Sequence, residues 1–373
     1  MKSRSDIFAG TDRTVQSPGD LSAVFKKLTP IGLSWECQIN TKGHMMSRSK
    51  SGDAQAEPLV VKKTMRIQGL MSREDYWLEV QKIVRISQQL SAIFTSRIKC
   101  LNFNLDGLVL TYAINDNVDI DMYFDSEDIR SAPFVILAEG SYEPFESSLL
   151  FKLAAECSSF CDIGANVGFY TLGALAVNPD IKILSFEPNI AVANRLSKNL
   201  SLKDRSGRGS VEIFNTALGE GEESGRTLFI PEFTGSGGAS LKDLHPDEGK
   251  ASEILISVTT LDFVIRDEPF IDLLKIDVEG FELSVIKGGI NVIREHKPTI
   301  FIELLRKWMA PFGSHPQDVL DLLMGLGYEC FAIGDEKIQV VEIVDDLTIE
   351  TNFIFCHPLR SSHMELMRES CKN

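Results

Sequence analysis

The chain has 373 residues, of which 53 are acidic and 38 are basic, so its formal net charge is −15 with neutral histidines. Binding to nucleic acid needs clustered lysine and arginine, and no dense basic cluster is present, so the composition excludes a general nucleic-acid-binding protein. Hydrophobic residues make up 43% and charged residues 24%, which is typical of a globular protein with a large core.

The sequence shows no sign of membrane insertion or export. No apolar segment reaches the ~20 residues that a membrane-spanning helix needs, and the first residues lack the apolar stretch of a signal peptide. We therefore expect a cytoplasmic protein without membrane contact. The seven cysteines, an odd number without a CxxC pair, are expected to be reduced and mostly buried.

The first part of the chain predicts a tail and an extension. Residues 1–30 are polar and lack hydrophobic periodicity, so they are expected to form a flexible tail. Residues 31–138 are expected to form an α+β extension. Its predicted elements are strands at 35–39 and 59–65, a loop at 47–56 between them, a helix at about 74–97, and a β-meander at 98–103, 108–114 and 118–124.

Residues 139–358 follow a different pattern, in which strands alternate with helices. This alternation predicts an α/β fold with a doubly wound parallel sheet covered by helices. The expected strands are 160–163, 182–186, 211–215, 273–276 and 299–303, and the expected helices are 168–177, 190–202, 281–294 and 316–325. Strands near 328–333, 337–343 and 352–356 follow, and the last two are expected to form an antiparallel pair at one end of the sheet. Residues 359–373 are expected to form a C-terminal tail.

A glycine-containing segment follows the first strand of this sheet: Asp162-Ile163-Gly164-Ala165-Asn166-Val167-Gly168-Phe169-Tyr170-Thr171. Gly164 lets the backbone turn sharply at the carboxyl end of the strand, where open α/β sheets bind ligands, and Gly168 allows the next helix to approach. The spacing differs from the G-x-G-x-x-G of dinucleotide sites, and the leading Asp162 would disfavour a pyrophosphate. The segment therefore predicts a sulfonium nucleoside without phosphate.

An acidic residue ends the second strand. Glu187 stands in the segment 186–189, 23 residues after Gly164. In nucleoside-binding doubly wound folds, a carboxylate at this strand end accepts hydrogen bonds from both ribose hydroxyls. An acid at a strand end is more often a solvated loop residue, but together with the preceding loop it indicates a ribose site.

Five blocks of this sequence resemble the FkbM family of S-adenosylmethionine-dependent methyltransferases. They are the lead-in at 139–144 (EGSYEP), the cofactor loop at 162–171, the ribose motif at 186–188 (FEP), the block at 274–282 (LKIDVEGFE) and the acidic strand end at 302–304 (IEL). The resemblance covers about residues 139–358. It implies a class I methyltransferase domain with a Rossmann-like sheet, which methylates a hydroxyl of a sugar, a glycan precursor or a polyketide-like secondary metabolite.

The resemblance also implies which residues contact S-adenosylmethionine. These are Asp162, Gly164, Ala165, Asn166, Gly168, Phe169, Tyr170, Thr171, Glu187, Pro188, Asn189 and, near the adenine, Ala217. Transfer to an alcohol needs a group that removes its proton. Asp277 is the first candidate for this base or for the acceptor of the substrate hydroxyl, and Glu279 is the second, with capping of the next helix as the alternative for Glu279.

Other features of the site stay open. Glu303 ends the following strand and is a further candidate catalytic carboxylate; with Asp277 it could hold a divalent cation, although two carboxylates are few ligands for Mg2+ and a hydroxyl clamp is favoured. A Gly/Ser-rich stretch at 235–240 resembles a mobile loop, followed by His245. Tyr142 and Trp308 are candidates for stacking on a substrate.

Two other functions compete with methyl transfer. A nicotinamide-dependent oxidoreductase could use a similar sheet, but the missing G-x-G-x-x-G and the acidic residue before the glycines count against it. A catalytically idle cofactor-binding module would not need its carboxylates, whereas this sequence retains Asp162, Glu187, Asp277 and Glu279. The sequence does not identify the methyl acceptor or the oligomeric state.

Overall fold

The computed structural model describes residues 36–40, 45–48, 97–104, 106–203, 207, 209–246, 249–266, 268, 270–334, 337–345 and 347–372. The tail at 1–30, the strand at 59–65 and nearly all of the helix predicted at about 74–97 lie outside these residues. No helix among the described residues is long and apolar enough to cross a membrane.

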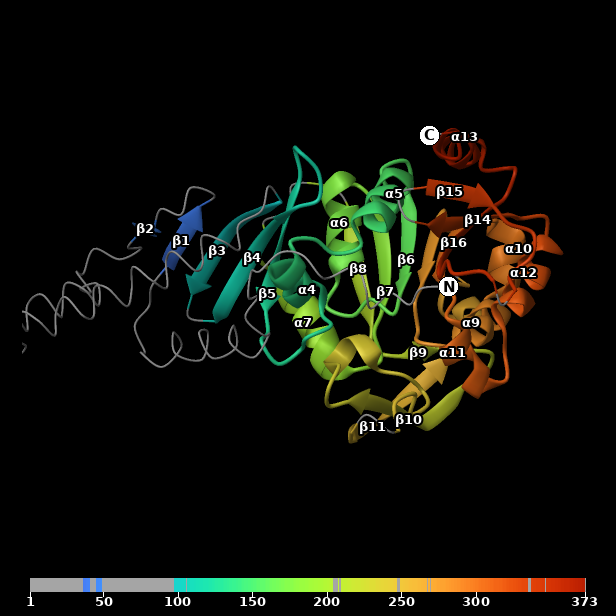
Figure 1. The fold of residues 1–373 in the computed structure, drawn as a ribbon, viewed down its shortest axis with the longest axis horizontal. Helices are drawn as coiled ribbons and strands as arrows, with labels where there is room; N and C mark the ends of the chain where they lie inside the picture. The colour runs from blue at the N-terminus through green and yellow to red at the C-terminus, as the bar shows by residue number, and fades with distance from the viewer. Residues whose placement is uncertain are drawn as a thin grey trace, which may run out of the picture.

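An eight-stranded mixed sheet forms the centre of the fold (Figure 1). Its order is β15-β14-β16-β13-β12-β6-β7-β8. The parallel strands are β6 (Ser159–Ile163), β7 (Lys182–Phe186), β8 (Ser210–Phe214), β12 (Leu273–Ile276) and β13 (Thr299–Glu303); the antiparallel strands are β14 (Glu329–Gly334), β15 (Lys337–Val340) and β16 (Asn352–Cys356). The doubly wound α/β fold is therefore confirmed. Its strand order reverses between β6 and β12, where such sheets bind ligands.

The central strands are buried along their whole length. Every residue of β6 and β12 is buried, including the polar Asp162 and Lys275. Apolar runs of this kind are typical of parallel strands covered by helices on both faces. The covering helices are α5 (Pro144–Ala154), α6 (Phe169–Val177), α7 (Ile190–Leu200), α9 (Glu282–Gly288), α10 (Ile290–His296) and α12 (Pro316–Met324).

Three details differ from the sequence-based expectation. The helix predicted at 281–294 is two helices, α9 and α10, which meet at Gly289. The strands β15 and β16 do not pair with each other, because each pairs with β14. The residues predicted as a C-terminal tail form helix α13 (Ser361–Ser370), which buries Met364 and Met367 against the core.

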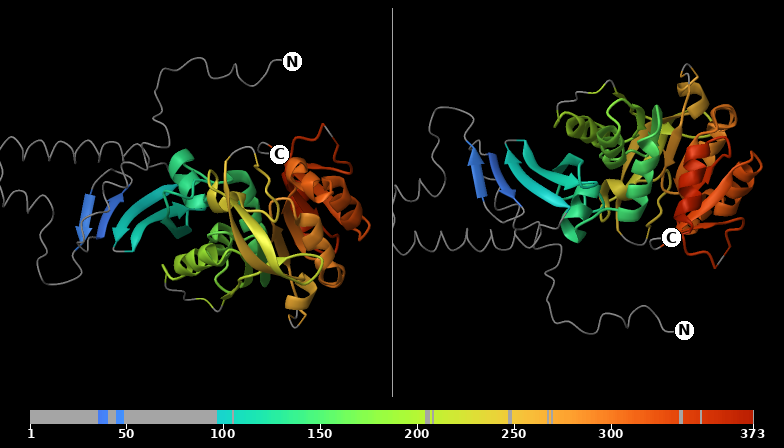
Figure 2. Two further views of the ribbon diagram at one scale, coloured as in Figure 1. Left: turned by 90° about the horizontal axis from the view of Figure 1, so that it is seen from below. Right: turned by 90° about the horizontal axis from the view of Figure 1, so that it is seen from above.

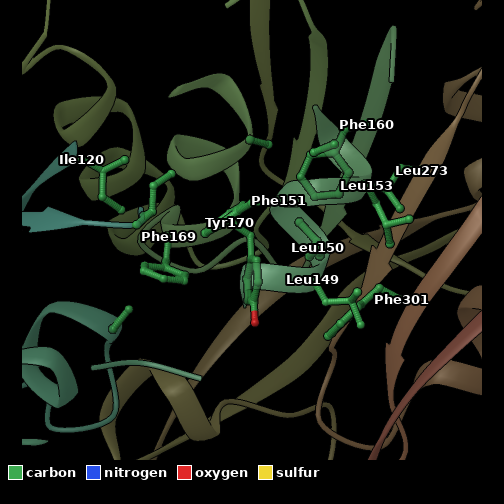
Figure 3. Packing of buried hydrophobic residues seen from close by; sticks show 14 of the residues in the cluster. Ile120, Leu149, Leu150, Phe151, Leu153, Phe160, Phe169, Tyr170, Leu273 and Phe301 are labelled. Carbon is green, nitrogen blue, oxygen red and sulfur yellow. The ribbon is translucent and has the colours of Figure 1, made fainter. Parts of the chain in front are cut away.

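Aromatic packing fixes the helix that begins at the cofactor loop. Figure 3 shows Phe151 of α5 beside Phe169 and Tyr170 of α6. The ring centroids of Phe151 and Phe169 are 5.8 Å apart, and a Cβ on Gly173 would lie only 2.1 Å from the Phe151 ring. Because α5 and α6 touch so closely, the start of α6 has little freedom to shift.

An antiparallel sheet extends the molecule beside α6 and α7 (Figures 1 and 2). It comprises β1 (Glu36–Asn40), β2 (Met45–Arg48), β3 (Ile98–Asn104), β4 (Gly107–Ala113) and β5 (Asp119–Phe124), so the meander predicted at 98–124 is present. Strand β2 was not predicted. The sheet joins the domain through β5, where the Tyr123 amide donates a 2.8 Å hydrogen bond to Asn199 Oδ1 of α7. The chain then passes through α4 (Ala132–Glu139) to α5.

A second small sheet, which the sequence did not predict, is inserted between β8 and β12. It comprises β9 (Ala217–Leu218), β10 (Glu223–Pro231) and β11 (Ala251–Thr259), with the 3-10 helix η2 (Gly235–Gly238) between β10 and β11. It lies below the main sheet in Figure 1. Two short helices, α8 (Leu261–Val264) and α11 (Arg306–Met309), complete this part of the fold.

Candidate active site

A cavity of about 310 Å3 lies at the carboxyl ends of β6, β7, β12 and β13. Its volume is at the lower end of the range of ~300–1,000 Å3 that is usual for small-molecule sites. The wall combines the loop after β6 and the ends of three other strands with residues 130–143 and the segment around η2. The cavity therefore stands at the reversal of strand order, where the sequence predicted a ligand.

The loop after β6 can form its turn only with glycine at its start. Gly164 has φ +79°, and a Cβ there would lie 1.8 Å from the Asp277 carbonyl oxygen. Asn166 also has a positive φ of 48°, a conformation in which asparagine is enriched. Its side-chain Oδ1 accepts a 2.7 Å hydrogen bond from the Val167 amide. The loop is thus held in one conformation at the cavity wall.

Glu187 directly follows β7, and each of its carboxylate oxygens accepts a hydrogen bond from a backbone amide. Its Oε2 accepts a hydrogen bond from the Asn166 amide (3.0 Å) and its Oε1 one from the Asn189 amide (2.9 Å). Burial raises the pKa of Glu187 to about 7, although these amides oppose the shift. Each oxygen keeps a further lone pair. The side chain therefore fits the predicted role of accepting two ribose hydroxyls.

Four of the residues expected to contact the cofactor do not line the cavity: Asp162, Gly168, Thr171 and Asn189. Asp162 is fully buried behind the loop, where its Oδ2 accepts a 2.6 Å hydrogen bond from Thr171 Oγ1. Gly168 packs against Leu196, and Asn189 caps α7 by accepting from the Ala191 amide. These residues support the loop from behind. The expected contacts that do line the cavity are Gly164, Ala165, Asn166, Phe169, Tyr170, Glu187, Pro188 and Ala217.

Lys275 is a buried cation at the floor of the cavity. Its Nζ donates to the Gly164 carbonyl (3.1 Å) and to Asp277 Oδ2 (3.0 Å), and it lies 3.9 Å from Asp162 Oδ1. Burial alone would lower the pKa of Lys275, but Asp277 and Asp162 more than offset this and hold the pKa above its usual range. The lysine therefore stays charged.

The predicted catalytic carboxylates, Asp277, Glu279 and Glu303, all line the cavity. Burial raises the pKa of Glu279 and of Glu303 well above the usual value, and the neighbouring Asp277 carboxylate adds to both shifts. The Oε2 atom of Glu279 is buried and has no hydrogen-bond partner among the residues that the structure describes. The structure thus brings together three carboxylates that sequence placed on two strand ends.

Glu279 does not cap the next helix, the alternative considered for it, because no side chain forms a capping hydrogen bond at the start of α9. The Oε1 atom of Glu282, the first residue of α9, accepts hydrogen bonds from the amides of Val278 (3.2 Å) and Gly280 (2.9 Å). Glu279 itself has φ 53°, and its carbonyl accepts a 2.7 Å hydrogen bond from Ser240 Oγ. Its carboxylate is left directed at the cavity.

One carboxylate of the wall was not singled out from the sequence. Glu143 lines the cavity, and the Tyr170 hydroxyl donates a short hydrogen bond to its Oε2. Burial raises the pKa of Glu143 to about 7. Glu143 lies within the block at 139–144 that resembles the FkbM lead-in, and this block is the sequence feature from which it could have been identified.

The Gly/Ser-rich segment is fastened to the site, whereas the sequence suggested a mobile loop. The Ser236 amide and Oγ donate to the two carboxylate oxygens of Asp128 (3.0 and 2.5 Å), and Asp128 in turn forms a 2.6 Å ion pair with Arg195. Asn166 Nδ2 donates to Ser236 Oγ at 3.2 Å. A hydrogen-bonded chain therefore joins η2, which covers the cavity, to the cofactor loop.

The aromatic candidates divide between the cavity and its surroundings. Tyr142 and Trp308 line the cavity, whereas His245 does not. The His245 ring lies edge-on to Trp308 with centroids 6.4 Å apart. In the part of the chain that the structure describes, no group of three or more His, Cys, Asp or Glu residues is arranged to hold a metal ion.

Comparison with known proteins finds a family whose profile matches the part of the chain that holds most of this site. Residues 162–330 match the profile of the methyltransferase FkbM domain. The methyltransferase sdnD of Sordaria araneosa is 29% identical over 187 residues, covering 42% of this chain and 68% of that protein. The hexuronic acid methyltransferase AglP of Haloferax volcanii is 27% identical over 176 residues, covering 47% and 65%.

A solved structure is also similar. The crystal structure of a methyltransferase FkbM from Methylobacillus flagellatus KT is 19% identical, with a TM-score of 0.34, and the match covers 60% of this chain and 52% of that one.

Proposed function

We propose that this chain, whose residues 162–330 match the methyltransferase FkbM domain, transfers a methyl group from S-adenosylmethionine to a hydroxyl of a small molecule. The observation that supports this most is the cavity at the strand-order reversal, which carries a ribose-type carboxylate, Glu187, on one side and the carboxylates Asp277 and Glu279 on another. Sugars, glycan precursors and polyketide-like metabolites are the acceptor classes in question.

The wall offers a matching group for each part of the nucleoside. Glu187 has lone pairs free for the two ribose hydroxyls, because one backbone amide occupies each of its oxygens. Phe186, Ala217 and Leu218 supply apolar surface beside it for the adenine ring. Gly164 leaves the backbone accessible where a side chain would collide with Asp277. When bound, S-adenosylmethionine supplies an activated methyl group on a sulfonium leaving group.

Asp277 is the carboxylate that we assign to the reacting hydroxyl of the acceptor. Asp277 Oδ2 is held by the Lys275 ammonium, so we assign Asp277 to accept the hydrogen bond of the reacting hydroxyl and to orient it. We assign Asp277 to take the hydroxyl proton as well. Transfer would join the hydroxyl oxygen to the methyl carbon and would leave the electron pair of the broken carbon–sulfur bond on sulfur.

The test is a calorimetric titration of the full chain with S-adenosylmethionine, S-adenosylhomocysteine and NAD+. Binding of the first two without NAD+ supports the proposal, and Asp277→Asn should keep this binding while abolishing turnover in a screen of hydroxylated acceptors. Binding of NAD+ alone would replace methyl transfer by the oxidoreductase hypothesis. If none of the three binds, the hypothesis of a catalytically idle module is favoured.

A further inference from the structure

The cavity wall is rich in carboxyl groups. Four carboxylates face the part of the cavity beyond Glu187; we call them the acidic wall: Glu143, Asp277, Glu279 and Glu303. They come from the turn before α5, from the segment after β12 and from the end of β13. The basic residues that line the same cavity in the described part of the chain are Arg130 and Lys275.

The ammonium of Lys275 does not pair with all of these carboxyl groups. It is shared by Asp277 and by Asp162, a further buried carboxylate that lies behind the cavity. Burial raises the pKa of Glu143 and of Glu303, and the nearby Asp277 carboxylate adds to both shifts. Glu279 presents a buried oxygen without a hydrogen-bond partner among the described residues. A buried carboxylate oxygen without a partner is unfavourable unless a ligand donates a hydrogen bond to it.

We infer that the acidic wall recognises a protonated amino group on the methyl acceptor, which makes the substrate an amino-bearing alcohol such as an amino sugar or an amino polyol. An ammonium has three donors and a full positive charge, so it donates to the unpaired Glu279 oxygen and favours the ionised form of the carboxyl groups around it. A neutral polyol satisfies only the hydrogen bonds, and a carboxylate-bearing acceptor is repelled.

The cofactor does not supply this charge by itself. S-adenosylmethionine carries a sulfonium, an ammonium and a carboxylate, so its net charge is +1. The acidic wall has four carboxyl groups, which is more than this single charge can pair with. The amine of the acceptor is the binding group and not the nucleophile, because a protonated nitrogen has no lone pair; the neighbouring hydroxyl receives the methyl group. This inference rests on the proposed methyl transfer.

Three two-carbon probes test the charge preference without knowledge of the whole acceptor: ethanolamine, ethylene glycol and glycolate. Each is added at constant ionic strength to the full chain saturated with S-adenosylhomocysteine, so that the cofactor's own ammonium is already in place, and the midpoint of thermal unfolding is measured. We expect ethanolamine to raise the midpoint by about 2–4 °C at concentrations well above its dissociation constant, and the other two probes to have no effect.

Two double variants show whether the ethanolamine shift depends on the acidic wall. Glu279→Gln with Glu303→Gln should keep S-adenosylhomocysteine binding and abolish the ethanolamine shift, whereas the control Glu212→Gln with Glu253→Gln, two exposed positions away from the cavity, should keep both. Equal shifts from ethanolamine and ethylene glycol, a larger shift from glycolate, no shift from any probe, or a shift that survives in the cavity variant would each overturn the inference. Failure of S-adenosylhomocysteine to bind is a separate result, which sinks the proposed function itself.

Discussion

The ammonium of Lys275 lies 3.0 Å from Asp277 Oδ2, and the same atom is 3.1 Å from the carbonyl oxygen of Gly164. One buried cation thus joins the carboxylate that follows β12 to the turn that follows β6. These are the two strands between which the order of the sheet reverses. The floor of the cavity depends on this contact, and so does the place that we propose for the reacting hydroxyl.

Lys275→Met is expected to destabilise the protein by about 3–5 kcal/mol, because it leaves the buried Asp162 and the partly buried Asp277 without their cation. Chemical denaturation measures the change. Lys275→Arg keeps the charge and should lose less stability, although its planar group does not reproduce the contact with Gly164. Wild-type stability in Lys275→Met would mean that the ion pair has no structural role.

Gly164→Ala is expected to cost at least ~2 kcal/mol of stability, since the residue has φ +79° and its new Cβ would collide with the Asp277 carbonyl. Cofactor binding should be lost with it. Gly221→Ala is the matched control, because nothing lies within 4 Å of a Cβ at that position. Its stability should stay within ~0.5 kcal/mol of wild type. Similar behaviour of the two variants would argue against the tight turn.

The stability of the ligand-free protein is expected to fall as the pH rises from about 4.5 to about 7. Burial raises the pKa of Glu143 from 4.5 to about 7, so the folded state holds a proton that the unfolded state has released in this range. Glu143→Gln keeps an acceptor for the Tyr170 hydroxyl and should remove a step on the order of 2 kcal/mol from this dependence. Unfolding free energies measured at several pH values test it, and an unchanged slope in the variant would refute it.

Asp128→Ala should release the η2 segment, because Asp128 binds both the amide and the hydroxyl of Ser236. Hydrogen–deuterium exchange is expected to become faster at residues 235–238 than in wild type. Asp125→Ala is the control: Asp125 lies 3.7 Å from the same Arg195, but among the described residues it forms no hydrogen bond with Ser236. Equal exchange in all three proteins would show that the contacts of Asp128 do not fasten the segment.

The α/β fold could be predicted because its central strands are short apolar runs that alternate with amphipathic helices. The small sheet could not, since β10 and β11 carry exposed residues along much of their length, such as Leu255 at 75% exposure, and so lack a clear hydrophobic period. The division of the helix at 281–294 was missed because apolar residues continue on both sides of Gly289.

The site was predictable where a motif joins adjacent residues and not where distant segments meet. Gly164, Glu187 and Asp277 each follow a recognisable strand, so their convergence at one edge follows from the topology. Asp128 and Ser236 lie 108 residues apart, and sequence spacing gives no indication that they pair. The burial of Asp162 behind the loop likewise depends on which face of β6 it occupies, and the motif alone did not decide this.

The most direct test of the account is the affinity of S-adenosylhomocysteine for the wild type, for Glu187→Ala and for the exposed control Glu212→Ala. Loss of the charged acceptor for the ribose hydroxyls is worth about 1.5–3 kcal/mol, so Glu187→Ala should bind roughly 10- to 100-fold more weakly, while Glu212→Ala binds as the wild type does. Unchanged affinity in a folded Glu187→Ala protein would contradict the assignment of this cavity as the methyltransferase cofactor site.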